Sequence, residues 1–144
     1  MKYIKAAIAV IALVLLDQWT KVLAVTHLMN TNGVTIIPNI FRLYYLENRG
    51  SAFGLMQNQK IFFVIFTILV LAVLTLIYRK IPDTKRMLPL KIAGILIYAG
   101  AIGNFIDRVR QSYVVDFFYF ELINFPIFNV ADIYVTTAAV ALIV

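Results

Sequence analysis

The sequence has no cysteine and a single histidine, His27, among its 144 residues. The lack of cysteine excludes disulfide bonds, thiolate metal ligands and a cysteine nucleophile. One histidine is too few for a zinc site built from histidine side chains, and the His-Glu-x-x-His motif of metallopeptidases is absent. We therefore expect no metal and no cofactor, so the chemistry of any active site must come from carboxylates, amides, hydroxyls and amines.

Charged residues are also few, at 14% of the chain, whereas hydrophobic residues make up 62% and the mean hydropathy is +0.90. These values lie far outside the range of soluble globular domains, and they predict an integral membrane protein. The net charge of +6 does not indicate a nucleic-acid partner, because the basic residues lie at the ends of apolar segments. At this length we expect one domain, covering residues 1–144.

Four apolar segments predict four transmembrane helices, at about residues 5–25, 61–78, 88–107 and 127–144. At 1.5 Å per residue, each is about as long as the hydrocarbon core is thick. Residues 30–55 lack helical periodicity and contain β-branched and aromatic runs, which predict two short strands. The predicted fold is an all-α integral membrane protein with four transmembrane helices and a small extracytoplasmic β-sheet subdomain. The sequence stops in apolar residues without a basic flank, so we expect a truncated C-terminus.

Seven of the thirteen basic residues lie in residues 1–5 and 79–91, next to predicted helices. Loops rich in lysine and arginine stay in the cytoplasm, so we expect the N-terminus and loop 79–91 there and residues 26–60 and 109–125 outside. With this topology the polar residues of the helices meet at the extracytoplasmic face. They are Asp17, Lys21, Asn104, Asp107, Arg108, Asn129 and Asp132.

Three aspartates, Asp107, Asp116 and Asp132, lie in or next to apolar sequence near this face. An ionised carboxylate is costly at membrane depth, so such residues indicate a functional site. Asp116 comes from an outer loop and Asp132 from the first turn of the last helix, and two carboxylates held close together share one proton and activate water. We expect Asp107 to be structural instead, paired with Arg108, Arg110 or a backbone amide.

The spacing of these residues alone leaves other functions open. The same acids could relay protons in a proton-coupled membrane carrier. Ser51, in a glycine-flanked turn, could form a Ser/Lys membrane peptidase with Lys60 or Lys21. Asp17 and Lys21, four residues apart on one helix face, are also typical of a structural ion pair at the outer interface. The aromatic residues between positions 117 and 128 fit either a groove lining or an interfacial belt.

Five short motifs follow one another along the chain: LLDQWTK, ENRGSAFG, GAIGNFIDR, VVDFF and FNVAD. They resemble the lipoprotein signal peptidase family, the bacterial signal peptidase II, over essentially the whole chain. The resemblance implies an intramembrane aspartic endopeptidase that removes signal peptides from diacylglyceryl-modified prolipoproteins. We expect a monomeric, multi-pass protein of the bacterial cytoplasmic (inner) membrane, with its active site near the extracytoplasmic face. Its expected partners are lipid-modified prolipoprotein signal peptides and membrane lipids.

Carried over residue by residue, the resemblance makes Asp116 and Asp132 the catalytic pair. The flanking valine and phenylalanine side chains should raise the pKa of Asp116, whereas Asp132 begins a helix, whose N-terminus favours negative charge. We therefore predict that Asp116 holds the shared proton and that ionised Asp132 deprotonates water, while asparagine and arginine donors stabilise the oxyanion. The resemblance implies these further site-lining residues: Asp17, Lys21, Asn48, Gly50, Asn104, Arg108, Asn129 and Ala131.

Overall fold

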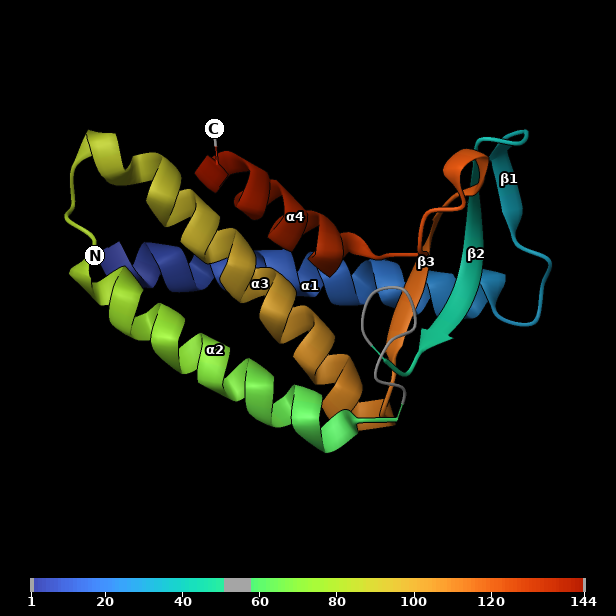
Figure 1. Ribbon diagram of the computed structural model, residues 1–144, viewed down its shortest axis with the longest axis horizontal. Helices are drawn as coiled ribbons and strands as arrows, with labels where there is room; N and C mark the ends of the chain where they lie inside the picture. The colour runs from blue at the N-terminus through green and yellow to red at the C-terminus, as the bar shows by residue number, and fades with distance from the viewer. Residues whose placement is uncertain (1, 51–57, 144) are drawn as a thin grey trace.

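The computed structural model describes residues 2–50 and 58–143, and long helices dominate it (Figure 1). The helices are α1 (Lys2–Leu28), α2 (Lys60–Lys80), α3 (Leu88–Gln111) and the shorter α4 (Val130–Ile143). By length and composition α1, α2 and α3 can each cross a membrane. The protein is therefore a mostly helical integral membrane protein, as its composition predicts.

The helices expose their apolar side chains rather than bury them. Ile8 and Leu15 on α1, and Ile65 and Leu69 on α2, are each more than half exposed. No residue of α2 is buried, although the whole helix lies within the described part of the chain. A helix that is apolar on all sides and still exposed requires lipid as its solvent, which agrees with a membrane protein.

α4 begins later than the sequence pattern predicts. The predicted span starts at residue 127, but Phe128 is extended and forms an isolated bridge with Phe118. Asn129 then caps the helix, so that its first helical residue is Val130. The 14 residues of α4 rise by about 21 Å, less than the roughly 30 Å of the hydrocarbon core.

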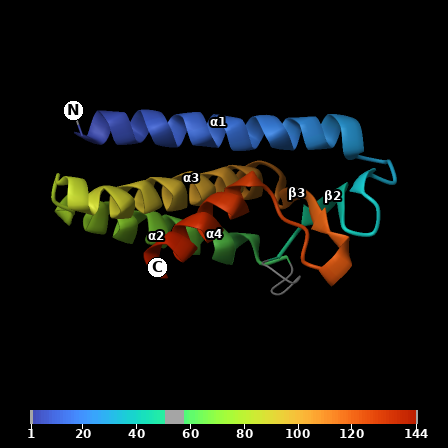
Figure 2. The same ribbon diagram turned by 90° about the horizontal axis from the view of Figure 1, so that it is seen from above.

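α3 lies at the centre of the helical part, where it contacts α1, α2 and α4. Figure 2 shows α1 on one side of the layer that the other three helices form. α3 and α4 approach closely at Gly100, because a Cβ atom there would lie 2.5 Å from the carbonyl oxygen of Ala131. The missing side chain of Gly100 therefore sets how near the first turn of α4 lies to α3.

A three-stranded antiparallel sheet lies at one end of the helices, whereas the N-terminus and the α2–α3 connection lie at the other end (Figure 1). The sequence predicts two of its strands, and the third lies in the expected outer loop. The register of this third strand against its neighbour places Asp116 opposite Leu46, so Asp116 belongs to a strand rather than to a loop. The strands are β1 (Val34–Ile37), β2 (Phe41–Asn48) and β3 (Val114–Phe120), in that order across the sheet; short 3₁₀ helices, η2 (Lys85–Met87) and η3 (Glu121–Ile123), precede α3 and follow β3.

A small apolar core attaches the sheet to the end of α1. Ala24 and Leu28 of α1 form one buried cluster with Val115 and Phe117 of β3. Because successive side chains of a strand point to opposite faces, Asp116 points away from this cluster. The core therefore holds β3 with the Asp116 carboxylate turned towards the start of α4.

Candidate active site

Asp116 is almost completely buried, with 1% of its surface exposed, in the middle of β3. Its Oδ2 atom accepts a hydrogen bond of 2.9 Å from the side-chain amide of Asn48, and its Oδ1 atom accepts one of 2.6 Å from that of Asn129. Burial, reinforced by the nearby charge of Asp132, raises the pKa of Asp116 to about 7. The two amide donors and Lys21 oppose this rise.

Asp132 lies in the first turn of α4 and takes part in a reciprocal cap with Asn129. The backbone N–H of Asn129 donates to Asp132 Oδ2 at 3.0 Å, and the backbone N–H of Asp132 donates to Asn129 Oδ1 at 3.1 Å. The second carboxylate oxygen, Oδ1, accepts a bond of 2.8 Å from the side-chain amide of Asn104. Both oxygens thus accept hydrogen bonds at a helix N-terminus, which fixes the orientation of this carboxylate.

Asn129 connects the two aspartates. Its side chain is fully buried, and its Nδ2 atom donates to Asp116 Oδ1 and, at 3.1 Å, to Asn104 Oδ1. The same residue caps α4 through Asp132. The structure therefore brings Asp116, Asp132, Asn104 and Asn129 into one hydrogen-bonded group, although they come from three different elements.

A second polar group, centred on the buried ammonium of Lys21, adjoins the group of Asp116, Asp132, Asn104 and Asn129. The Nζ atom of Lys21 lies 3.0 Å from Asp17 Oδ2 and 3.0 Å from Asp107 Oδ2, and it donates to Asn104 Oδ1 at 2.9 Å. All three N–H bonds of the ammonium are therefore used. Gln18 completes this lysine network (Asp17, Gln18, Lys21 and Asp107), since its Nε2 atom donates to Asp107 Oδ1 at 2.9 Å.

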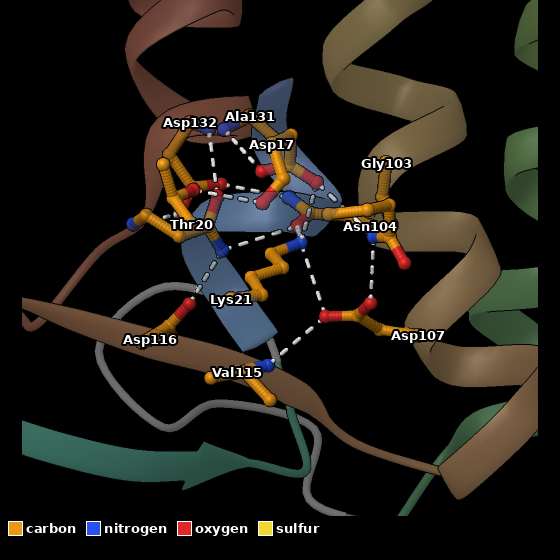
Figure 3. A network of polar contacts seen from close by, with 12 residues as sticks. Asp17, Thr20, Lys21, Gly103, Asn104, Asp107, Val115, Asp116, Ala131 and Asp132 are labelled. Atoms are coloured by element: carbon orange, nitrogen blue, oxygen red, sulfur yellow. Dashed lines mark hydrogen bonds and ion pairs between the residues drawn. The ribbon is translucent and has the colours of Figure 1, made fainter. Parts of the chain in front are cut away.

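The lysine network also holds the backbone next to each candidate catalytic acid (Figure 3). Asp17 Oδ1 accepts a bond of 2.9 Å from the N–H of Ala131, the residue before Asp132. Asp107 Oδ2 accepts a bond of 3.1 Å from the N–H of Val115, the residue before Asp116. One lysine thus bridges two carboxylates, each of which fixes the main chain beside one member of the pair.

A match to a protein-family model shows which family the chain belongs to. The family model that matches, described as signal peptidase (SPase) II, covers residues 9–144. The chain belongs to the signal peptidase II family. A relative named lipoprotein signal peptidase, from Streptococcus thermophilus (strain CNRZ 1066), is 43% identical over 143 residues, which are 99% of this chain and 92% of the relative. Another of the same name, from Caldanaerobacter subterraneus subsp. tengcongensis, is 45% identical over 138 residues, which are 94% and 92% of the two chains.

Solved structures support the same assignment. One, described as a bacterial membrane enzyme solved by the in meso method at 2.3 Å resolution, has a TM-score of 0.85 at 34% identity, over 96% of this chain and 85% of its own. A second, at 1.9 Å resolution, has a TM-score of 0.84 at 33% identity, over 96% and 90%. The predicted family, peptidase class and membrane fold are therefore confirmed.

Of the partners expected for Asp107, the structure shows the backbone amide and neither arginine. Asp107 was expected next to Arg108, Arg110 or a backbone amide; it does accept the Val115 amide, but its ionic partner is Lys21. Arg108 instead donates to the carbonyl oxygen of Gly50 at 3.1 Å, and its guanidinium lies 4.6 Å from the centroid of the Phe63 ring. Neighbours in sequence need not share a helix face, and here Asp107 and Arg108 turn to different elements.

The remaining candidates are Gly50, Ser51 and Lys60. Gly50 lies beside the pair, since its N–H donates to the side-chain oxygen of Asn48 at 3.0 Å. Ser51 lies outside the described residues. Lys60 donates to the carbonyl oxygen of Val109 at 3.2 Å and to Ser112 Oγ at 3.1 Å, at the C-terminal end of α3. Within the described part of the chain, no group of three or more histidine, aspartate or glutamate side chains could hold a metal ion.

Gln18 is the site residue that the motif analysis does not single out. It directly follows Asp17 on α1 and donates to the Gly103 carbonyl oxygen at 3.2 Å as well as to the carboxylates. A glutamine just after a long apolar run and beside an aspartate is the signal that could have identified it. The aromatic residues pack chiefly on one another, with ring centroids 5.6 Å apart for Phe118 and Phe128.

Proposed function

We propose that this peptidase cleaves the signal peptide from diacylglyceryl-modified prolipoproteins at the bacterial cytoplasmic membrane, with Asp116 and Asp132 as the catalytic pair. The observation that carries the proposal is the bridge made by Asn129, which hydrogen-bonds to one acid through its side chain and caps the other. This bridge holds the two acids close enough that the charge of Asp132 raises the pKa of Asp116. Two carboxylates so close together can share one proton, the arrangement that aspartic peptidases use to activate water.

In the proposed mechanism Asp116 begins with the proton and Asp132 begins ionised. Asp132 removes a proton from water while the water oxygen attacks the scissile carbonyl carbon, and Asp116 gives its proton to the carbonyl oxygen. The tetrahedral intermediate collapses when the C–N bond breaks and the proton on Asp132 passes to the departing nitrogen. The products are a carboxylic acid and a free amine, and the proton of Asp116 is regained from the intermediate's hydroxyl.

The surrounding residues take supporting roles in this mechanism. Asn48 and Asn104 each donate to one acid and keep its carboxylate oriented, and Arg108 supplies positive charge for the developing oxyanion. The backbone N–H of Gly50 donates to Asn48 Oδ1 and so holds the side chain that donates to Asp116. Asp17 and Lys21 position the two acids indirectly. Asp17 holds the backbone of Ala131, next to Asp132, and Lys21 pairs with Asp107, which holds the backbone next to Asp116.

We also propose that the site lies near the extracytoplasmic face. The sheet, which contains Asp116 in β3, lies at the opposite end of the helices from the N-terminus and the basic loop 79–91 (Figure 1). α4 begins, with Asp132 in its first turn, on the side nearer the sheet. Since basic loops remain in the cytoplasm, the end with the sheet faces outward. The protein works as a monomer among membrane lipids, with the lipid-modified prolipoprotein as its partner and no nucleic acid.

The direct test is cleavage of a purified, lipid-modified prolipoprotein by the detergent-solubilised protein. Asp116→Asn and Asp132→Asn should each lower the rate by about a hundredfold or more without unfolding, because asparagine keeps the shape and removes the proton chemistry. Glu121→Gln is the matched control, since this partly exposed acid lies away from the pair and contacts Arg42 on the sheet. Cleavage should resist EDTA and a serine-directed reagent. Full activity of either asparagine variant would refute the pair.

Ser51→Ala separates this proposal from a Ser/Lys peptidase. We expect the variant to retain cleavage, because all three N–H bonds of Lys21 are occupied and Lys60 is bonded to α3. Complete loss of cleavage in a folded Ser51→Ala protein would favour the serine mechanism. A proton-coupled carrier would instead show substrate uptake without any peptide product.

A further inference from the structure

A cavity of about 400 Å³ lies at the end of the helices far from the sheet. Ala6, Ala7 and Val10 of α1 form one wall, Tyr78 and Arg79 of α2 form the other, and Tyr98 of α3 lies at its base. α1 and α2 both contact α3 but do not pack closely on each other, which leaves this groove between them. Its volume lies in the range of ligand pockets.

The walls of the groove offer almost nothing to a polar ligand. The hydroxyl of Tyr98 donates to the carbonyl oxygen of Leu71 at 3.0 Å and contacts the hydroxyl of Thr75. These polar atoms at the base are thus satisfied within the protein. Ala6 and Ala7 make the α1 wall shallow between the larger side chains of Tyr3 and Ile11, so an extended hydrocarbon chain fits there better than a second bulky helix does.

The rim of the groove is positively charged. Arg79 lines the groove, is exposed, and has no ion-pair partner among the described residues. The one acid of the adjoining loop, Asp83, is paired with Lys91. Lys80, Lys85 and Arg86 of this loop likewise have no ion-pair partner in the described part of the chain. The groove is apolar, and the basic side chains at its rim are not neutralised by nearby acids. This combination suits a ligand with an apolar chain and an anionic head group.

We propose that this groove binds one anionic phospholipid from the surrounding leaflet, with an acyl chain against Ala6, Ala7 and Val10 and the phosphate at Arg79. A signal peptide does not suit it, because the N-terminal region of signal peptides is itself positively charged and would be repelled by the rim. A second copy of the chain would bring the same net positive charge. The acyl chains of zwitterionic lipids fit the walls equally well, but their head groups gain less electrostatic attraction from the basic rim.

Native mass spectrometry in a mild detergent tests the site without using catalysis as a readout. The protein is mixed with equal amounts of phosphatidylglycerol and phosphatidylcholine with identical acyl chains. We expect the singly bound state to favour phosphatidylglycerol about fivefold, the effect of one basic residue at a membrane surface. Arg79→Gln should remove this preference. Arg86→Gln removes one positive charge at the same end of the helices but outside the groove. It should leave most of the preference for phosphatidylglycerol.

A second pair of variants tests the groove itself. Ala7→Phe fills it and should lower the binding of both lipids several-fold, whereas Ile8→Phe alters an exposed neighbour outside it and should not. Equal binding of the two lipids, equal losses in Arg79→Gln and Arg86→Gln, or unchanged binding in Ala7→Phe would each overturn the proposal. So would displacement of phosphatidylglycerol by an equal concentration of a synthetic signal peptide.

Discussion

Asn129 serves both candidate catalytic acids although it carries no charge itself. Its amide nitrogen is a donor to Asp116, and its amide oxygen accepts the backbone N–H of Asp132. An aspartate in its place would lose the donor and add another carboxylate, and a leucine would lose both bonds. The assignment of these atoms as nitrogen and oxygen follows from the network, because only this orientation satisfies every neighbour.

The raised pKa of Asp116 predicts a pH-dependent cost to stability. The native state holds this proton up to about pH 7, whereas an ordinary aspartate loses it near 3.8. The contribution of Asp116 to the free energy of unfolding is therefore greatest below about pH 4 and is lost as the pH rises towards 7. Asp116→Asn removes this cost, so we expect it to unfold at a higher temperature than the native protein at pH 8, by a margin worth about 2–4 kcal/mol.

The fluorescence of Trp19 during heating, in detergent at pH 5 and pH 8, measures this difference. The margin should be much smaller at pH 5 than at pH 8, and an equal margin at both values would contradict the assignment. Cleavage by the native protein should also decline above about pH 7, as the pair loses its shared proton. That apparent pKa belongs to the pair, and residue-resolved infrared titration showing Asp132 protonated and Asp116 ionised would reverse the proposed roles.

Lys21 gives the second prediction at this scale. Lys21→Met leaves Asp17 and Asp107 buried without their shared cation, which should lower the free energy of unfolding by about 3–5 kcal/mol. The charge of Lys21 also lowers the pKa of Asp116, so the alkaline decline of cleavage should move to higher pH in the variant. A purely structural lysine would change the melting temperature but not the pH profile.

The control for this variant is Lys80→Met, which removes the same charge from an exposed position at the far end of the helices. It should alter neither the melting temperature nor the pH profile. Adding Asp107→Asn to Lys21→Met removes one of the stranded charges and should restore part of the stability. An unshifted alkaline decline in Lys21→Met would show that the lysine does not tune the pair.

At the scale of elements, the position of α4 against α3 decides where Asp132 lies. A methyl group at Gly100 would meet the backbone carbonyl of Ala131, which cannot move without moving the helix. Gly100→Ala should therefore lower the cleavage rate by about tenfold or more and reduce the melting temperature, since a shift of 1 Å at a catalytic group has effects of this order. Cleavage assays and thermal unfolding measure both effects.

Gly94→Ala provides the matched control on the same helix. There the new Cβ atom would lie 3.1 Å from a ring atom of Tyr78, and a side chain can yield where a backbone cannot. Activity should remain near that of the native protein. If Gly100→Ala and Gly94→Ala behave alike, the close approach of α3 and α4 does not control the site.

The helices could be predicted from the sequence because a lipid-facing helix must be apolar on all sides, and such runs are visible without any partner. β3 could not, since its strand character depends on pairing with β2, which lies about 70 residues earlier. Asp116 interrupts the apolar run and made the segment look like a loop. The start of α4 was missed by three residues because the cap at Asn129, not hydrophobicity, ends the extended segment.

The same distinction applies to the site. The acids themselves are visible as rare charges in apolar sequence, and the motifs assign them to a family. Their partners are tertiary facts: Lys21 and Asp107 are more than 80 residues apart, and the expected pairing with Arg108 came only from its nearness in sequence. The catalytic roles of Asp116 and Asp132 stay predictions until the variants are tested.

At the scale of the whole molecule, topology can be tested cleanly because the native chain has no cysteine. Ser112→Cys places a thiol at an exposed position where α3 ends, beside β3. We expect an impermeant thiol reagent added to intact spheroplasts to label it, and not to label Thr84→Cys in the basic loop. Labelling of Thr84→Cys alone would invert the orientation and place the carboxylates on the cytoplasmic side.

The order of the elements along the chain has a consequence for biosynthesis. The lysine network begins with Asp17 in α1, and it ends on the backbone of Ala131 in α4, which is synthesised more than 100 residues later. In the proposed mechanism, a chain halted after α3 has neither Asp132 nor the Asn129 bridge, so it cannot hydrolyse a peptide while it is still being inserted. Proteolytic activity thus arises only after α4 has been synthesised and has packed against α3.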